Sequence, residues 1–238
     1  MAVRVTPRRS GRDRSGSYIC PVLAIAKREP SAFLFAGQIL GVLLYPFMTG
    51  SVGRAAFSLF GIAILGLVVL AVRDSPGVTW VAITLALPAS VLLLIQVVTG
   101  DDALLPYSSA FEAVLYFYAA GALIAYMLAD HEVTRDELFA VGATFTLVAW
   151  AFAYVYVVCQ AIEPETFTAA VDPTAERSWM ELLFMSFTTL SSTGLGDVIP
   201  VQSFGRSVVM IEQLVGLAFV AMLVSRIVGL TVLRGARR

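Results

Sequence analysis

The sequence contains few charged residues for its length. Aspartate, glutamate, lysine and arginine make up 14% of its 238 residues, whereas 58% of the residues are hydrophobic. A soluble domain carries about 25% charged residues. The charges are also segregated, because they gather at the ends of the chain and in short gaps between long uncharged stretches. This pattern excludes an ordinary soluble domain and indicates an integral membrane protein with several spans.

Histidine and cysteine are scarce as well. The single histidine, His131, excludes a metal site built from a histidine cluster. The two cysteines, Cys20 and Cys159, fall on opposite sides of the membrane in the topology predicted below, which excludes a disulfide between them. A net charge of −1 gives no reason to expect a nucleic-acid partner. The residue types form no catalytic constellation, so we predict neither an enzyme nor a cofactor.

Long apolar runs predict six membrane-spanning helices. A helix needs about 20 apolar residues to cross the hydrocarbon core of a bilayer. Runs of this kind cover 32–49, 54–72, 78–98, 109–129, 138–160 and 205–228. Glycine, proline or charged residues separate them.

The distribution of basic residues predicts the orientation. Cytoplasmic segments of membrane proteins carry an excess of arginine and lysine. With the N-terminus in the cytoplasm, thirteen basic residues lie inside: Arg4, Arg8, Arg9, Arg12, Arg14, Lys27, Arg28, Arg73, Arg135, Arg226, Arg234, Arg237 and Arg238. Only Arg54, Arg177 and Arg206 then lie outside. We therefore predict cytoplasmic termini and a location in the plasma or inner membrane.

The segment 161–204, between the fifth and sixth spans, has a different character. It begins with acidic residues, continues with a short apolar stretch from Trp179 to Leu190, and ends in a glycine-containing loop and Pro200. Twelve residues are too few to cross a bilayer, so the segment is predicted to enter from outside and turn back. Ser178 and Glu181 have the spacing of a capping box, which predicts that a helix starts at Trp179. The negative end of the dipole of this helix would face the membrane centre, where it suits a cation.

The loop after the short helix reads Thr188-Thr189-Leu190-Ser191-Ser192-Thr193-Gly194-Leu195-Gly196-Asp197. Non-helical backbone at membrane depth is tolerated only where it lines a cavity or is buried in protein. Alternating glycines allow a backbone whose carbonyls all point one way, because glycine reaches angles that other residues avoid. The sequence therefore predicts a pore-lining strand.

At these residues the chain resembles the pore module of tetrameric potassium channels, whose signature is Thr-Val-Gly-Tyr-Gly-Asp. The resemblance covers about 176–230 and includes Asp197, Pro200, Phe204-Gly205-Arg206 and Gly216. Because the chain has one such loop, the resemblance implies a homotetramer around one pore. It also implies that potassium ions are held by the carbonyls of Ser192, Thr193, Gly194 and Leu195 and by the Ser192 hydroxyl, with Gly196 completing the filter.

The resemblance implies further site residues. Asp197, Thr188, Thr189, Ser191 and Phe184 are expected to support the filter, and Gly216 is expected to be a gating hinge, with close helix packing as the alternative. Val220, Val224 and Val228 repeat every four residues and are predicted to line the inner pore. Glu212 is predicted either to modulate the ion pathway or to bond to the half-helix, since a carboxyl within a span is costly.

The resemblance also has limits. Ser192, Thr193 and Leu195 stand where threonine, valine and tyrosine are usual, so no phenol can hydrogen-bond behind the filter. The positions that usually brace the aspartate are Phe184 and Thr188. A weakly selective monovalent cation channel of the same architecture therefore stays open as an alternative, and a secondary transporter is a more distant one. Helix 109–129 has no arginine or lysine, only Glu112, which argues against conventional voltage sensing.

The predicted fold is an all-α membrane protein with six transmembrane helices and a re-entrant half-helix with its filter loop. We divide it into a basic cytoplasmic arm (1–30), a peripheral four-helix membrane domain (31–130), a cytoplasmic linker (131–137), a pore domain (138–232) and a basic cytoplasmic tail (233–238). The pore domain comprises an outer helix (138–160), the half-helix (179–190), the filter (192–197) and an inner helix (205–232). Besides other copies of itself, the chain is expected to contact membrane lipid, with anionic headgroups at the terminal arginines.

Overall fold

The computed structural model describes residues 30–47, 50–73, 77–100, 102–129 and 135–236. The predicted N-terminal arm and His131 lie outside these residues. The elements are α2 (Pro30–Leu44), the 3-10 turn η1 (Tyr45–Phe47), α3 (Gly50–Arg73), α4 (Thr79–Thr99), the 3-10 turn η2 (Asp102–Leu104), α5 (Leu105–Leu128), α6 (Arg135–Ile162), β1 (Phe167–Ala169), α7 (Trp179–Leu190), β2 (Val198–Pro200) and α8 (Ser203–Ala236).

Six of the described helices are long and apolar enough to cross a membrane, in agreement with the six predicted spans. The helices are longer than the apolar runs. The α5 helix starts at Leu105 rather than 109, with Pro106 in its first turn, where proline is well tolerated. The α6 helix starts at Arg135 and carries Asp136 and Glu137 in its first turn, so the predicted linker 131–137 loses its last three residues. Acidic residues favour a helix N-terminus because they interact well with its dipole.

The first turn of α6 is tied to two other helices. The Asp136 carboxylate accepts hydrogen bonds from the backbone nitrogen and the hydroxyl of Ser31 in α2, at 3.2 and 3.0 Å. Glu137 Oε2 lies 3.0 Å from Nη2 of Arg226 in α8, and both side chains are largely buried. Charges that the sequence would place in a solvated linker therefore fasten α6 to α2 and α8.

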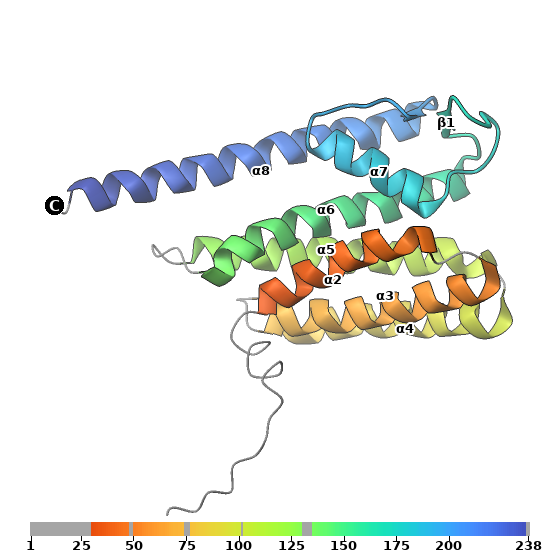
Figure 1. Ribbon diagram of the computed structural model, residues 1–238, viewed down its shortest axis with the longest axis horizontal. Coiled ribbons are helices and arrows are strands. Elements are labelled where there is room, and N and C mark those ends of the chain that lie inside the picture. Colours follow the sequence, from red (N-terminus) through yellow and green to blue (C-terminus); the bar gives the residue numbers. More distant parts are fainter. Residues whose placement is uncertain (1–29, 48–49, 74–76, 101, 130–134, 237–238) are drawn as a thin grey trace, which may run out of the picture.

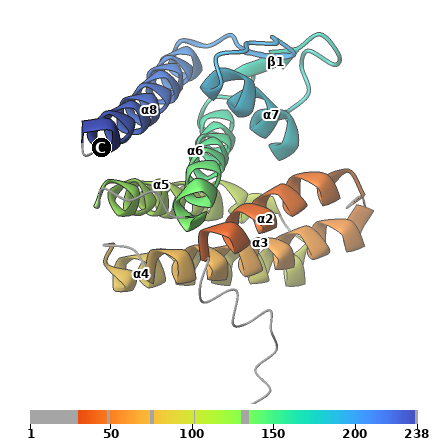
Figure 2. The same ribbon diagram turned by 60° about the vertical axis from the view of Figure 1, so that its left-hand side comes forward.

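The helix α6 occupies the middle of the fold. Figure 2 shows it between the group formed by α2, α3, α4 and α5 and the pair formed by α7 and α8, and it packs against α2, α5 and α7. Its buried side chains include Leu147 and Trp150, which join Leu34, Ile64 and Tyr116 in one hydrophobic core. By contrast, α8 extends along one side of the molecule (Figure 1). In the most apolar 18-residue stretch of each helix, 67% of the residues are buried in α6 but only 17% in α8.

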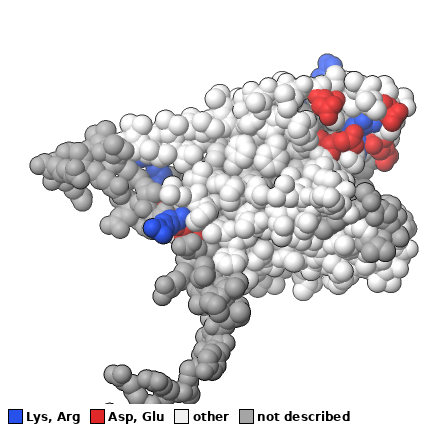
Figure 3. Space-filling model, in the orientation of Figure 1, with Lys and Arg blue, Asp and Glu red and all other residues white. Residues whose placement is uncertain are grey.

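Charged side chains gather at the two ends of the helices. In Figure 3, acidic groups with a few basic ones cover the end where β1 and the start of α7 lie. A second group lies toward the other end, and the surface between them is uncharged on this face. An uncharged band between two charged ends is the surface expected of a chain that crosses a bilayer. The chain is thus a multi-pass membrane protein of mostly helical structure.

Two short strands join the segments on either side of α7. Residues 167–169 pair antiparallel with 198–200, with Thr168 opposite Ile199. This pairing was not predicted, because three-residue strands are too short to show the alternation by which strands are recognised. Gly205 packs closely on it, since a Cβ at that position would lie 2.4 Å from Cγ2 of Thr166. The strands and Gly205 thereby fix where α8 begins.

Candidate functional site

The short helix α7 begins with the predicted capping box. The Ser178 backbone nitrogen donates to Glu181 Oε2 at 2.7 Å, and the Glu181 backbone nitrogen donates to Ser178 Oγ at 3.3 Å. Glu181 also forms an ion pair with Arg177, with 3.3 Å between Oε1 and Nη1. These contacts satisfy donors that a helix N-terminus otherwise leaves unpaired. The start of α7 is therefore well defined.

Arg177 organises the loop that leads into α7. Its side chain is buried, and its guanidinium donates to the backbone carbonyls of Val171, Asp172 and Ala175. Its backbone is held in turn by the side-chain amide of Gln160, the third residue from the end of α6. A planar guanidinium with five donors can collect several acceptors in this way. Arg177 is therefore a structural residue, although the sequence pattern placed it only as an outer charge.

The C-terminal end of α7 holds the loop that follows it. The Thr188 carbonyl accepts hydrogen bonds from the backbone nitrogens of Thr193 and Gly194, at 2.9 and 3.0 Å. The Ser192 backbone nitrogen donates to the Thr189 carbonyl at 3.0 Å. The Ser191 and Thr193 hydroxyls also bond to each other. Thr188, Thr189 and Ser191, which were predicted to support the filter, thus all contact the loop or its first residues.

The backbone of the loop alternates in handedness. The φ angles are +59° at Ser192, +59° at Gly194 and +71° at Gly196, whereas Thr193 and Leu195 between them are not in the positive-φ region. A Cβ added at Gly194 or Gly196 would meet no atom within 4 Å in a single chain. The glycines are therefore required by conformation rather than by lack of space. Ser192 adopts this conformation without being a glycine, which costs free energy.

The loop carbonyls are free in the single chain. The amides of residues 191–194 point back to α7, but none of the carbonyls of 191–196 accepts a hydrogen bond from any residue that the structure describes. All residues from Ser191 to Asp197 are exposed, and Leu195 is 67% exposed. Unpaired carbonyl oxygens next to a helix C-terminus are the kind of group that can coordinate a cation.

Glu212 in α8 lies in a buried polar cluster with side chains of α6 and α7. Its side chain is 0% exposed, and its carboxylate oxygens accept hydrogen bonds from the hydroxyls of Tyr156 in α6 and Ser186 in α7. The Ser186 hydroxyl also lies 2.8 Å from the Ala149 carbonyl of α6. The Glu212 carboxylate thus joins α6, α7 and α8. This agrees with the predicted bond to the half-helix, whereas Tyr156 and Ser186 were missed because one hydroxyl in an apolar run gives no signal.

Gly216 lies where α8 touches the end of α7. A Cβ on Gly216 would lie 2.1 Å from the Leu190 carbonyl oxygen and 3.1 Å from the Leu190 Cα. Only glycine permits this approach, which is the close packing considered as an alternative to a hinge. The hinge role itself stays a prediction.

The other predicted residues lie on the surface of the single chain. Phe184 is partly exposed, and Asp197 has no hydrogen-bond partner among the described residues. Val220, Val224 and Val228 are each about half exposed along α8. An exposed apolar row on a spanning helix must face lipid, a pore or another chain.

Comparison with known proteins places this region in a family. Residues 143–232, which contain most of α6, all of α7 and most of α8, match the sequence model of a family described as "Ion channel". Over 103 residues the chain is 32% identical to Protein LctB of Geobacillus stearothermophilus, and the match covers 42% of this chain and 76% of that protein. No solved structure matches the chain. The half-helix, the loop and the family match lead to one conclusion: the chain belongs to the pore-loop ion-channel superfamily.

Proposed function

We propose that four copies of this chain form a channel that conducts potassium ions passively through a filter made by the carbonyls of residues 192–195. The observation that carries the proposal is the loop after α7, in which the amides are bound to the helix end and the carbonyls are free. This arrangement leaves the carbonyls able to replace the hydration shell of a potassium ion.

The position of α7 supports cation conduction. The helix has 12 residues, about 18 Å at 1.5 Å per residue, and it lies between two full spans. If it enters the membrane from the outer side, its C-terminal end reaches only part of the way across. The partial negative charge at that end then favours a cation near the filter.

The exposed surface supports assembly into a tetramer. One chain supplies one filter strand, which cannot enclose an ion. The α8 helix is mostly unburied, and large apolar side chains are exposed along it, among them Met210, Ile211, Leu214, Leu217, Val220, Val224 and Val228. Neighbouring chains can cover part of this surface, while the pore lies along another part.

A weakly selective cation channel is the second candidate, and Asp197 is the observation that favours it. The residue is exposed and lacks a partner within the described part of the chain, and Leu195 offers no hydroxyl to a neighbour. A filter with few braces behind it tolerates ions of different size more readily than a rigid one. Conventional voltage sensing is not proposed, since α5 contains no arginine or lysine between Leu105 and Leu128.

The orientation is proposed from the arginine count, with both termini in the cytoplasm and the start of α7 outside. The arginines near the two termini are then placed to contact anionic lipid headgroups of the inner leaflet. Labelling of single cysteines at Glu165 and Arg73 with an impermeant thiol reagent tests this topology.

Recording from purified protein in planar bilayers tests the function. In opposing potassium and sodium gradients, a selective filter gives a reversal potential near the potassium equilibrium potential, whereas the second candidate gives one near zero. The variant Gly196→Ala should abolish unitary currents, because φ at this position is +71°. Gly66→Ala in α3 is the matched control, since its Cβ would meet nothing within 4 Å. Normal currents from Gly196→Ala would overturn the filter assignment, and coupled transport without unitary currents would favour a transporter.

A further inference from the structure

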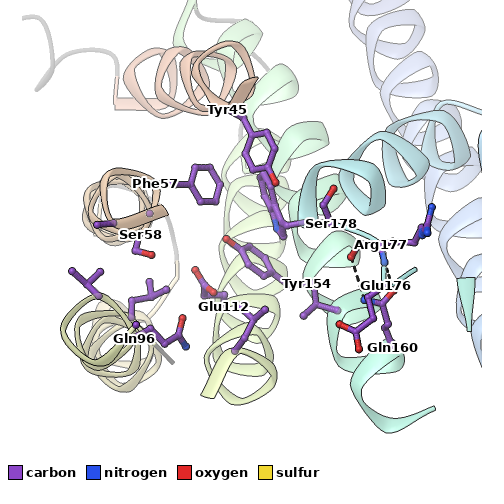
Figure 4. A pocket seen from close by; sticks show the side chains of 18 residues that line it. Tyr45, Phe57, Ser58, Gln96, Glu112, Tyr154, Gln160, Glu176, Arg177 and Ser178 are labelled. Carbon is purple, nitrogen blue, oxygen red and sulfur yellow. Dashed lines mark hydrogen bonds between the residues drawn. The ribbon is translucent and has the colours of Figure 1, made fainter. Parts of the chain in front are cut away.

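A cavity of about 480 Å³ lies outside the filter, between the peripheral helices and the start of α7. Figure 4 shows side chains from η1, α3, α4, α5 and α6 and from the residues around Ser178 pointing toward it. A volume of this size accommodates a small organic ligand. None of the predicted filter residues lines it.

A buried carboxyl group lines this cavity. Glu112 in α5 is 1% exposed, and Tyr154 of α6 interacts with its carboxyl group. Figure 4 shows the polar ends of Glu112 and Tyr154 directed toward each other at the wall of the cavity. Among the side chains that the structure describes, no arginine or lysine forms an ion pair with Glu112. A carboxyl group within a membrane span is costly to keep, and such residues commonly mark functional sites.

Aromatic rings form another part of the wall. Trp179 lies at the centre of a cluster in which its ring centroid is 5.9 Å from that of Tyr45, 5.1 Å from that of Phe57 and 5.6 Å from that of Tyr154. All four residues line the cavity. The Trp179 indole N–H is also buried without an acceptor among the described residues. Aromatic faces attract organic cations, and tryptophan attracts them most strongly.

The basic and amide side chains of the cavity are already engaged. Arg177 uses its guanidinium on three backbone carbonyls and on Glu181. Gln160 bonds to the Arg177 backbone, and Gln96 donates to Ser108 at 3.0 Å. The carboxyl group of Glu112 is therefore the buried acidic group of the cavity, and Glu176 adds a second, exposed carboxyl group to its lining. The cavity thus favours a positively charged group over a negatively charged one.

We infer that this cavity binds an organic ammonium group, with Glu112 as its counter-charge and the packed rings of Phe57, Tyr154 and Trp179 along one side of it. The group can belong to a free amine or to the headgroup of a lipid such as phosphatidylcholine. Trp179 is the first residue of α7 and Ser178 is its cap. A bound ammonium group would therefore contact the first turn of α7, the helix that precedes the filter. Its binding should alter the open probability of the channel. This last step rests on the proposed channel function, whereas the binding step does not.

Binding of benzyltrimethylammonium to the full chain, in nanodiscs of phosphatidylglycerol alone, tests the site by calorimetry. Its uncharged isostere neopentylbenzene should bind at least about tenfold more weakly, because it offers nothing to the carboxyl group. Glu112→Gln should lose at least about tenfold in affinity for the same reason. Phe57→Leu should lose about threefold, because one aromatic face is removed. Glu163→Gln, the same change of charge outside the cavity, should leave affinity unchanged.

Equal affinity for the cation and its isostere would overturn the proposal, as would undiminished binding to Glu112→Gln. If Glu112→Gln does not fold, the comparison of the two probes and the Phe57→Leu variant decide. Adding phosphatidylcholine to the nanodiscs identifies the source of the ammonium group. If the site binds the lipid headgroup, the apparent affinity for benzyltrimethylammonium falls as the fraction of phosphatidylcholine rises. If the site binds a free amine instead, the apparent affinity stays the same. Binding without any change in unitary currents would overturn the coupling to α7, whereas absence of currents in every condition would count against the channel.

Discussion

The Glu212 cluster gives the sharpest test of how the pore segment is held together. In Glu212→Ala the hydroxyls of Tyr156 and Ser186 both lose their carboxylate acceptor in buried surroundings. Hydrogen bonds between helices in membranes contribute about 0.6–2 kcal/mol each. Two such bonds place the loss in unfolding free energy at about 1–4 kcal/mol, with a further contribution from the cavity that the smaller side chain leaves. Glu212→Gln, which retains the volume and one acceptor, should lose about half as much.

The assay is unfolding of the purified protein by titration with sodium dodecyl sulfate, followed by circular dichroism. Tyr156→Phe is the second single variant of a double-mutant cycle with Glu212→Gln, because it removes the hydroxyl group and keeps the ring. If the two residues share one hydrogen bond, combining Tyr156→Phe with Glu212→Gln should cost less than the sum of the single variants by about 0.5–1.5 kcal/mol. Additive effects, or a loss below about 0.5 kcal/mol in Glu212→Ala, would refute the view that this carboxylate fastens the three helices.

Two further variants test contacts of α8. Gly216→Ala should abolish unitary currents or lower the stability of the assembly by about 1–3 kcal/mol, because its Cβ would lie 2.1 Å from the Leu190 oxygen. The control Gly66→Ala should do neither. Currents and unfolding of Gly216→Ala like those of the parent chain would contradict the close contact. Arg226→Gln should raise or lower open probability in bilayer recordings by removing the link to Glu137 at 3.0 Å, and Glu137→Gln should shift it in the same direction. Opposite shifts, or none, would show that the pair does not hold α6 and α8 together during gating.

The features that could be predicted from the sequence are those that depend on local patterns. The six spans follow from the length of apolar runs, and the start of α7 follows from Ser178 and Glu181, which form the capping box in the structure. The glycines at 194 and 196 indicated unusual backbone angles, and both have positive φ. In each case the deciding residues are close together in the chain.

The features that were missed depend on contacts between distant segments. Tyr156 and Glu212 are 56 residues apart, and Ser31 and Asp136 are 105 apart, so no local pattern connects them. The cavity around Glu112 is formed by α3, α4, α5 and α6, each of which reads as an ordinary span, together with the turn η1 and the start of α7. The sequence thus showed a carboxyl group, Glu112, within an apolar span, and only the fold showed which side chains surround it.

The contact between Gly216 and Leu190 has a mechanical consequence. A bend or rotation of α8 at Gly216 cannot leave the last residue of α7 in place, because no side chain lies between the two backbones. The next residues along the chain are those whose amides are bound to the Thr188 and Thr189 carbonyls. Under the proposed function, motion of α8 and the binding of ions to the loop would therefore influence each other by the same free energy in both directions, as linkage requires. A change in ion binding at the loop should therefore alter the position of α8, just as a change in α8 should alter ion binding.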